Sequence, residues 1–142
     1  MGRNSTRQKV VLDTNIFVSG IHWTGASRVV LDAWKRGTFE LVVSAPILAE
    51  IVRTLQDFKL KLDDDEFLWW YTTVVETAIF VSSVQKISIV EDPDDDKFIE
   101  AAVAANASYI LSQDKHLLKI GVYKNVHIVT PEHFVALLTK NT

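Results

Sequence analysis

Carboxylate side chains recur close behind short apolar segments of this 142-residue chain. Asp13 directly follows the apolar residues 10–12, Asp114 lies three residues beyond residues 109–111, and five acids crowd into residues 91–96. Carboxylates held a few ångströms apart repel one another, and their pKa values rise unless a cation neutralises them. Oxygen ligands without Cys or His suit Mg²⁺ or Mn²⁺, ions that support phosphodiester hydrolysis. The pattern therefore indicates a metal-dependent hydrolysis of phosphodiester bonds.

The elements that must position these acids alternate between strands and helices. Short apolar runs predict strands at residues 9–12, 39–43, 87–90, 109–111 and 126–129. Apolar periodicity and capping signals predict helices at residues 26–36, 46–55, 63–81, 92–106, 114–118 and 130–138. Strands that alternate with helices argue for a parallel sheet covered by helices on both faces. We therefore expect an α/β fold with helices in the two outer layers.

Such a sheet would gather the acids at one edge. Ligands of open α/β sheets bind outside the carboxyl ends of the strands, where each strand end here delivers a carboxylate. The predicted catalytic residues and metal ligands are Asp13, Glu50, Asp96 and Asp114. Asn15 and Ser112 are expected to orient a carboxylate or a metal-bound water molecule.

Within the acidic run, a purely structural reading competes with metal binding. Asp92 as an N-cap, followed by Pro93 and further acids, is a favourable helix start. This reading accounts for Asp94 and Asp95, and less well for Asp96, which lies further into the predicted helix. Asp92 and Asp94 remain the alternative metal ligands.

Composition bounds the class of protein. A chain of this length with 48% apolar and 23% charged residues predicts one globular domain and excludes disorder. We expect a flexible tail at residues 1–8 and a single domain at residues 9–139. The absence of cysteine excludes disulfide scaffolds, Cys zinc sites and thiol nucleophiles. No signal peptide or membrane-spanning segment is visible, so a cytoplasmic protein without membrane contact is expected.

Three motifs in this order and spacing resemble the PIN domain family. They are Val11-Leu12-Asp13-Thr14-Asn15, Asp92-Pro93-Asp94-Asp95-Asp96-Lys97-Phe98 with the Ala-rich helix behind it, and Tyr109-Ile110-Leu111-Ser112-Gln113-Asp114. The similarity covers about Lys9 to Leu138 and is closest to the bacterial and archaeal branch of toxins from toxin–antitoxin systems, the VapC-like ribonucleases. The resemblance implies a three-layer α/β/α sandwich with a Rossmann-like parallel sheet, the PIN-like fold.

The resemblance also implies an activity and partners. It suggests a Mg²⁺- or Mn²⁺-dependent endoribonuclease whose acidic positions correspond to Asp13, Glu50, Asp96 and Asp114, supported by Asn15 and Ser112. Toxins of this kind are usually held inactive by a cognate antitoxin and commonly form homodimers or higher homo-oligomers. The expected partners are therefore RNA, an antitoxin protein and a second copy of the chain.

Several assignments stay open at the level of sequence. Arg53, Lys97, Lys115 and Lys119 are candidate contacts to RNA phosphates, or solvated surface cations. The aromatic cluster of residues 67–71 packs in the core or covers a partner. The alternative function is a catalytically inactive PIN-fold module that binds RNA or protein, although all four acidic positions are filled. A haloacid-dehalogenase-type phosphohydrolase is disfavoured because Asn15 stands where that family needs a second Asp.

Overall fold

A mostly parallel sheet forms the centre of the molecule. The computed structural model describes residues 7–57, 62–82 and 85–140. The strands are β1 (Lys9–Leu12), β2 (Glu40–Val43), β3 (Ile79–Phe80), β4 (Tyr109–Leu111), β5 (Val122–Tyr123) and β6 (Val126–Val129). They are ordered β3-β2-β1-β4-β6-β5, and every neighbouring pair is parallel except β5 with β6.

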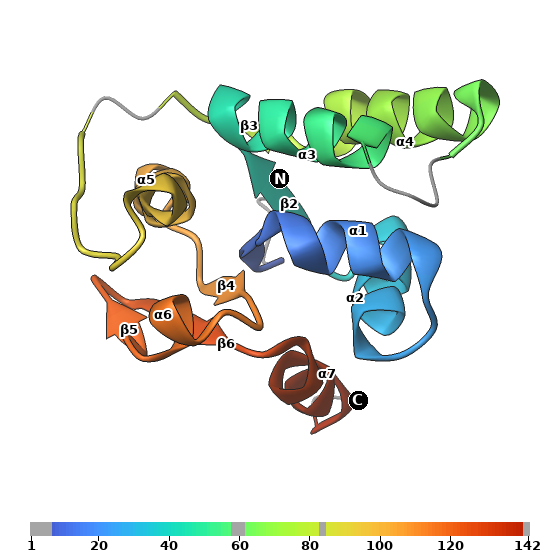
Figure 1. Ribbon diagram of the computed structural model, residues 1–142. Helices are drawn as coiled ribbons and strands as arrows, with labels where there is room; N and C mark the ends of the chain where they lie inside the picture. Colours follow the sequence, from blue (N-terminus) through green and yellow to red (C-terminus); the bar gives the residue numbers. More distant parts are fainter. Residues whose placement is uncertain (1–6, 58–61, 83–84, 141–142) are drawn as a thin grey trace, which may run out of the picture.

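Helices cover both faces of this sheet (Figure 1). One face carries α1 (Thr14–His22), α2 (Ala26–Lys35) and α7 (Pro131–Lys140), and the other carries α5 (Asp96–Ala105). Beside β2 and β3 lie α3 (Ala45–Asp57) and α4 (Asp64–Thr77), while the 3-10 turn η1 (Pro93–Asp95) and α6 (Lys115–Leu118) lie near the strand ends. The predicted three-layer α/β/α fold is confirmed.

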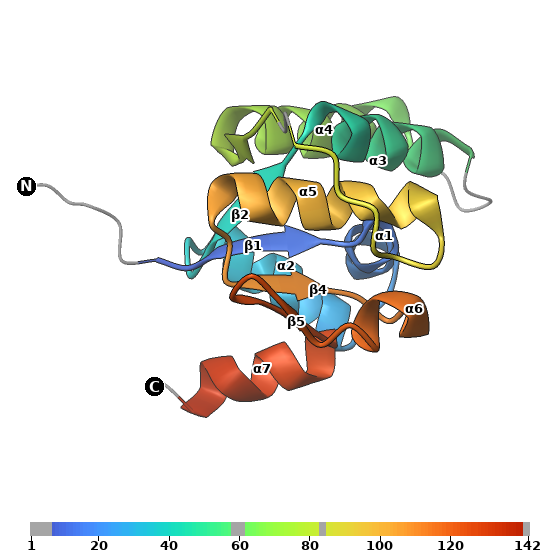
Figure 2. The same cartoon turned by 90° about the vertical axis from the view of Figure 1, so that its left-hand side faces the viewer.

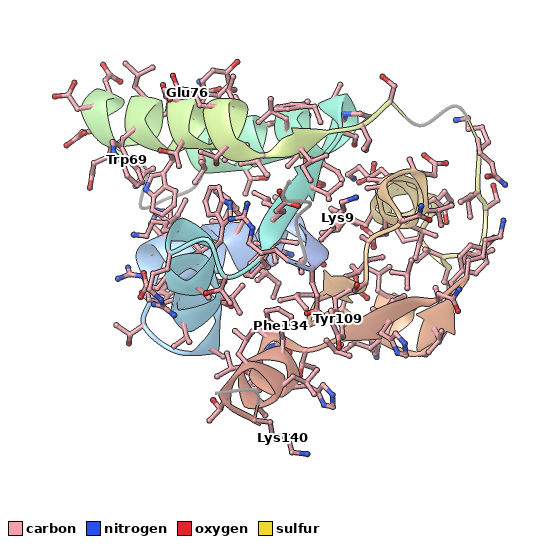
Figure 3. The ribbon with its side chains drawn as sticks, turned by 180° about the vertical axis from the view of Figure 1, so that it is seen from behind. Lys9, Trp69, Glu76, Tyr109, Phe134 and Lys140 are labelled. Atoms are coloured by element: carbon pink, nitrogen blue, oxygen red, sulfur yellow. The ribbon has the colours of Figure 1, made fainter. Side chains whose placement is uncertain are left out.

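The central strands β1, β2 and β4 consist mainly of apolar residues because both faces of the sheet are covered there. Val10 and Val11 of β1 and Ile110 of β4 are completely buried. Phe134 of α7 packs edge-on against Phe39 and Tyr109, with ring centroids 5.5 Å and 5.4 Å away (Figure 3). These rings fix α7 against the sheet beneath it.

Helix α1 is absent from the sequence prediction. It begins directly after Asp13, whose side chain accepts a hydrogen bond from the Asn15 N–H at the N-cap. Gly20 is a poor helix former in isolation, and it obscured the periodicity of residues 14–22. Packing explains why glycine stands at this position, because a Cβ atom at Gly20 would lie 2.7 Å from the Leu31 side chain of α2. The close approach of α1 and α2 therefore requires glycine there.

One strand assignment and one helix end were wrong. Residues 87–90 do not join the sheet, and the strand next to β2 is Ile79–Phe80, where Val42 pairs with Ile79. The helix predicted over residues 63–81 accordingly ends at Thr77. The N–H groups of residues 89 and 90 instead donate hydrogen bonds to the carboxylate of Asp96.

Strand β5 also lies outside the prediction. Lys124 and Asn125 adopt positive φ angles of 47° and 69°, the backbone of a tight hairpin turn between β5 and β6. Asn tolerates this conformation well, whereas Lys does so rarely, which hid the turn signal.

Arg7 and Gln8, predicted to belong to the flexible tail, are part of the fold. The Glu40 N–H donates to the Gln8 carbonyl at 2.8 Å, and the Arg7 guanidinium lies 3.5 Å from the Glu40 carboxylate. The remainder of the predicted tail, residues 1–6, lies outside the described residues. Within the part of the chain that the structure describes, no helix is both long enough and apolar enough to cross a membrane.

Replacing Phe134 should show how much α7 contributes to stability. Phe134→Ala removes a fully buried ring and leaves a cavity, so the free energy of unfolding should fall by about 3–5 kcal/mol. Urea unfolding measures the change. Val122→Ala, at an exposed position, is the control and should shift it by less than about 0.5 kcal/mol. Similar stabilities for both variants would contradict the packing described.

Candidate active site

The register of the central strands puts Asp13 and Ser112 side by side. Leu12, Leu111 and Val129 are aligned as the last residues of β1, β4 and β6. The hydrogen-bond ladder continues one residue further, from the Asp13 N–H to the Leu111 carbonyl at 3.0 Å and from the Ser112 N–H to the Val129 carbonyl at 3.0 Å. Figure 2 shows β1 pointing towards this edge, where α1 and α6 begin. Side chains that follow the strands therefore meet there.

Ser112 connects two of the predicted acids. Its hydroxyl donates to Asp13 Oδ2 at 2.7 Å and accepts from the Asp114 N–H at 2.9 Å. Asp114 in turn caps α6, where Oδ1 accepts from the His116 N–H at 2.7 Å. Ser112 is completely buried, so these bonds are shielded from water and hold the Asp13 carboxylate in one orientation.

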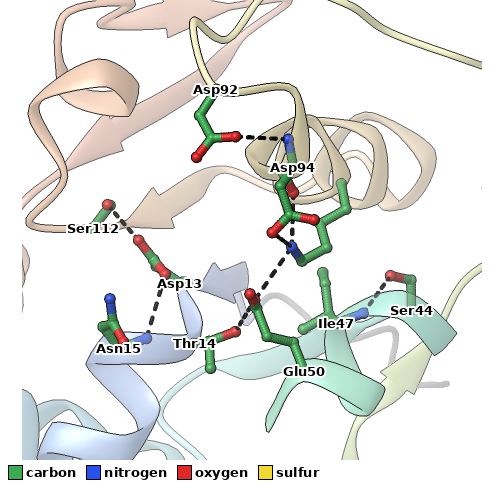
Figure 4. A network of polar contacts seen from close by, with 10 residues as sticks. Asp13, Thr14, Asn15, Ser44, Ile47, Glu50, Asp92, Asp94 and Ser112 are labelled. Carbon is green, nitrogen blue, oxygen red and sulfur yellow. Dashed lines mark hydrogen bonds and ion pairs between the residues drawn. The ribbon is translucent and has the colours of Figure 1, made fainter. Parts of the chain in front are cut away.

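Glu50 reaches the same edge from α3. Ser44 caps the start of this helix, and its hydroxyl accepts a long hydrogen bond of 3.5 Å from the Ile47 N–H. One turn further on, Glu50 Oε1 accepts from the Thr14 hydroxyl at 2.5 Å and lies 3.3 Å from Lys97 Nζ. In Figure 4 the Asp13 side chain points towards Ser112, and the Glu50 side chain points towards the turn that carries Asp94. Thr14, which the sequence prediction did not include, thus connects the opening motif to Glu50.

Asp96, one of the predicted metal ligands, accepts hydrogen bonds from the segment that precedes its helix. Its side chain is buried, and Oδ1 accepts hydrogen bonds from the Ile89 and Val90 N–H groups at 3.0 Å and 2.8 Å. Asp96 therefore fixes the segment before η1 to the first turn of α5. This oxygen is therefore already engaged by two backbone donors.

The neighbouring Asp95, which was not among the predicted ligands, interacts electrostatically with Asp13 and Asp114. It is half-buried, and burial is the main cause that raises its pKa to about 7. The negative charges of Asp13, Asp114 and Asp92 raise the pKa further, and Lys97 lowers it only in part. The Asp95 carboxyl is therefore coupled electrostatically to Asp13 and Asp114.

The environment of Asp13 is similar. Burial raises the pKa of its carboxyl above the usual value, and the hydrogen bonds from Ser112 and the Asn15 backbone oppose that rise. The charges of Glu50 and Asp114 raise it again. The Asp13 carboxyl is therefore repelled by two other acids, Glu50 of α3 and Asp114 at the start of α6.

The donor set fits a hard divalent cation. Asp13, Asp95 and Asp114 offer carboxylate oxygens only, and their mutual repulsion is the condition that a bound cation would relieve. Among the described residues, no three acidic or histidine side chains lie close enough together to hold one ion without movement. Binding would therefore draw the carboxylates closer together.

The other predicted residues take various positions. Asp92 caps η1 by accepting from the Asp94 N–H at 3.0 Å, and Asp94 pairs with Lys97 at 3.0 Å. The side chain of Asn15 is exposed, as are the three remaining candidate RNA contacts, Arg53, Lys115 and Lys119. Lys119 pairs with Glu91 at 2.8 Å.

The contrast between Asp95 and Asp96 can be tested by stability. Because the pKa of Asp95 is raised, its ionisation destabilises the fold as the pH rises from about 4 to about 7. Asp95→Asn should therefore stabilise the metal-free protein at and above pH 7 by about 1 kcal/mol after solvent screening, or about 4 °C in Tm. The gain should vanish below about pH 4, where the carboxyl is protonated.

Asp96→Asn is the matched comparison and should lower Tm at pH 7. It replaces a charged acceptor of two backbone hydrogen bonds by a neutral one, a loss of about 1–2 kcal/mol. Differential scanning fluorimetry over a pH series measures both variants. Shifts of the same sign at pH 7 would contradict the assignment of the two side chains.

Comparison with known proteins agrees with this architecture. The PIN domain family profile matches residues 9–116. An uncharacterised protein of Methanocaldococcus jannaschii, MJ1680, is 27% identical over 139 residues, and the match covers 89% of each chain.

Two solved structures share the fold. The structure of VapBC2 from Rickettsia felis bound to a DNA fragment from their promoter superposes with a TM-score of 0.56 and 16% identity, covering 84% of this chain and 96% of the other. The T. brucei RRP44 PIN domain superposes with a TM-score of 0.51 and 14% identity, covering 96% and 84%. Since the family profile spans most of the chain, the protein belongs to the PIN domain family, whose members are generally nucleases.

Proposed function

We propose that this protein is a metal-dependent endoribonuclease. The observation that carries the proposal is that Ser112 joins Asp13 and Asp114 at one edge of the sheet. Burial, together with the charges of these two acids, raises the pKa of Asp95 to about 7. Such a concentration of like charge is costly to the fold and is typical of a site that a cation completes. The family, whose members are generally nucleases, supports the reaction class.

Mg²⁺ or Mn²⁺ is the proposed cofactor, held by Asp13, Asp95 and Asp114. When bound, such an ion polarises the phosphodiester and lowers the pKa of a water molecule. Ser112 holds the Asp13 carboxylate in place, and the α6 cap fixes Asp114. Glu50 adds negative charge next to Asp13, and its position is set by Thr14 and Lys97.

RNA is the proposed substrate class, and an antitoxin is the proposed regulator. Both follow from the resemblance to toxins of toxin–antitoxin systems, and the fold is shared with the Rickettsia felis VapBC2 structure. Helix α4 exposes Leu68, Trp69, Tyr71 and Val75, an apolar surface that an antitoxin or a second copy of the chain would cover. We place the protein in the cytoplasm with its RNA substrate.

The activity assay uses a labelled single-stranded RNA with Mn²⁺ and with chelator. Asp13→Asn and Asp95→Asn should each reduce the cleavage rate by at least about 100-fold. Substituting a residue that only supports a metal ligand already lowers activity about 10–100-fold. Lys35→Met, on the opposite side of the sheet from α5, should leave the rate unchanged.

Metal binding is measured on the same proteins by the shift in Tm on adding Mn²⁺. A shift in the wild type that Asp95→Asn loses supports the site. Metal-independent cleavage, or full activity of both Asp variants, would refute the proposal. Failure of the wild type to bind metal or to cleave would favour the alternative, an inactive PIN-fold module that binds RNA or protein.

A further inference from the structure

Lys97 lies inside the acidic site, although its place in the sequence suggests a surface lysine. Only 11% of its side chain is exposed. Its ammonium group donates to the Asp94 carboxylate at 3.0 Å and to the Asp94 carbonyl at 2.7 Å, and it lies 3.3 Å from Glu50 Oε1. The dashed lines that leave Asp94 and Glu50 in Figure 4 meet at this group.

These contacts specify the position of the charge. Lysine rarely loses its contact with water, because an ammonium group is costly to bury unless it is paired. Here the partners come from two elements, Glu50 from α3 and Asp94 from η1, and the ammonium also lies 4.9 Å from the centre of the Phe98 ring. An ammonium held in this way is poorly placed to reach out to an RNA phosphate. Lys97 therefore differs from the exposed Lys115 and Arg53.

Lys97 divides the acidic edge into two halves. On the side of α3, the charge of Glu50 is compensated by an ion pair. The carboxylates of Asp13 and Asp114, linked through Ser112 at the ends of β1 and β4, form no such ion pair among the described residues. They repel one another and Asp95. The two halves adjoin, since Glu50 also acts on Asp13.

We propose that Lys97 is a resident cation of the active site, which occupies the place of a second divalent ion beside Glu50. The site then binds a single divalent ion, on the side of Asp13, Asp95 and Asp114. This inference rests on the proposed function as a metal-dependent nuclease. In two-metal sites the ions lie about 3.5–4 Å apart, so a fixed ammonium on Glu50 would exclude a second ion by charge and by space.

The stoichiometry of Mn²⁺ binding tests the proposal without any activity measurement. Isothermal titration calorimetry of the full chain gives the number of bound ions. Electron paramagnetic resonance, which detects the free Mn²⁺, checks that number independently. The wild type should bind one ion. Lys97→Met frees Glu50 and Asp94 from their counter-charge and should bind two, whereas Lys97→Arg keeps the charge and should bind one.

Lys35→Met is the matched control. Lys35 also pairs with an aspartate three residues earlier, Asp32 at 3.6 Å, and also lies over an aromatic ring, that of Trp70 at 5.4 Å. Its removal should leave the stoichiometry at one ion. Circular dichroism checks that each variant is folded. Should Lys97→Met not fold, Lys97→Gln, which keeps hydrogen-bond donors without the charge, replaces it with the same expectation of two ions.

The contradicting outcomes are distinct. Two ions in the wild type would overturn the role of Lys97 and leave the proposed function intact. One ion in Lys97→Met, or in Lys97→Gln where that replaces it, would also overturn the role, and weaker RNA binding by that variant would reassign Lys97 to a phosphate contact. No Mn²⁺ binding by the wild type would refute the proposed function itself, and with it this inference.

Discussion

The alignment of β1, β4 and β6 is the constraint on which the site depends. Because the three strands end together, the hydrogen-bond ladder extends through Asp13 and Ser112 before the chain turns away. A shift of one residue between β1 and β4 would move Asp13 to the opposite face of the sheet from Ser112. The fully buried side chains of Val10, Val11 and Ile110 prevent such a shift, since any other register would expose them or bury polar groups. The apolar core thus holds the polar edge in place.

Part of the fold and of the site followed directly from the sequence. Strands buried on both faces give continuous apolar runs, which identify β1, β2 and β4. Strand β6, in which the exposed His127 interrupts the apolar residues, consists otherwise of β-branched residues, which favour strands. Residues that directly follow such strands have little freedom, so Asp13 and Ser112 were located without knowing the three-dimensional structure. The edge strands β3 and β5 have only two residues each, too few for a pattern. Their pairing is decided by tertiary contacts and, for β5, by a turn with unusual backbone angles.

The acidic run marks the point where sequence reasoning reached its limit. Successive residues of a helix point about 100° apart, so choosing Asp96 instead of Asp95 changes which side chain faces the sheet edge. The run of acids offers no pattern that fixes this rotation. It is fixed by Asp96 itself, whose buried carboxylate accepts the N–H groups of Ile89 and Val90. The sequence alone therefore does not distinguish Asp95 from Asp96 as the acid that acts together with Asp13.

The two short edge strands have a consequence for how this protein can assemble. An exposed sheet edge is a template for pairing with another chain, and the length of the edge strand limits how many hydrogen bonds such pairing can form. The strands at both edges have only two residues each, so few backbone N–H and C=O groups are available for pairing with another chain. Association through a continuous intermolecular sheet is therefore disfavoured, which also lowers the tendency to aggregate. Any specific assembly must use side chains on the helices, where shape and charge can distinguish one partner from another.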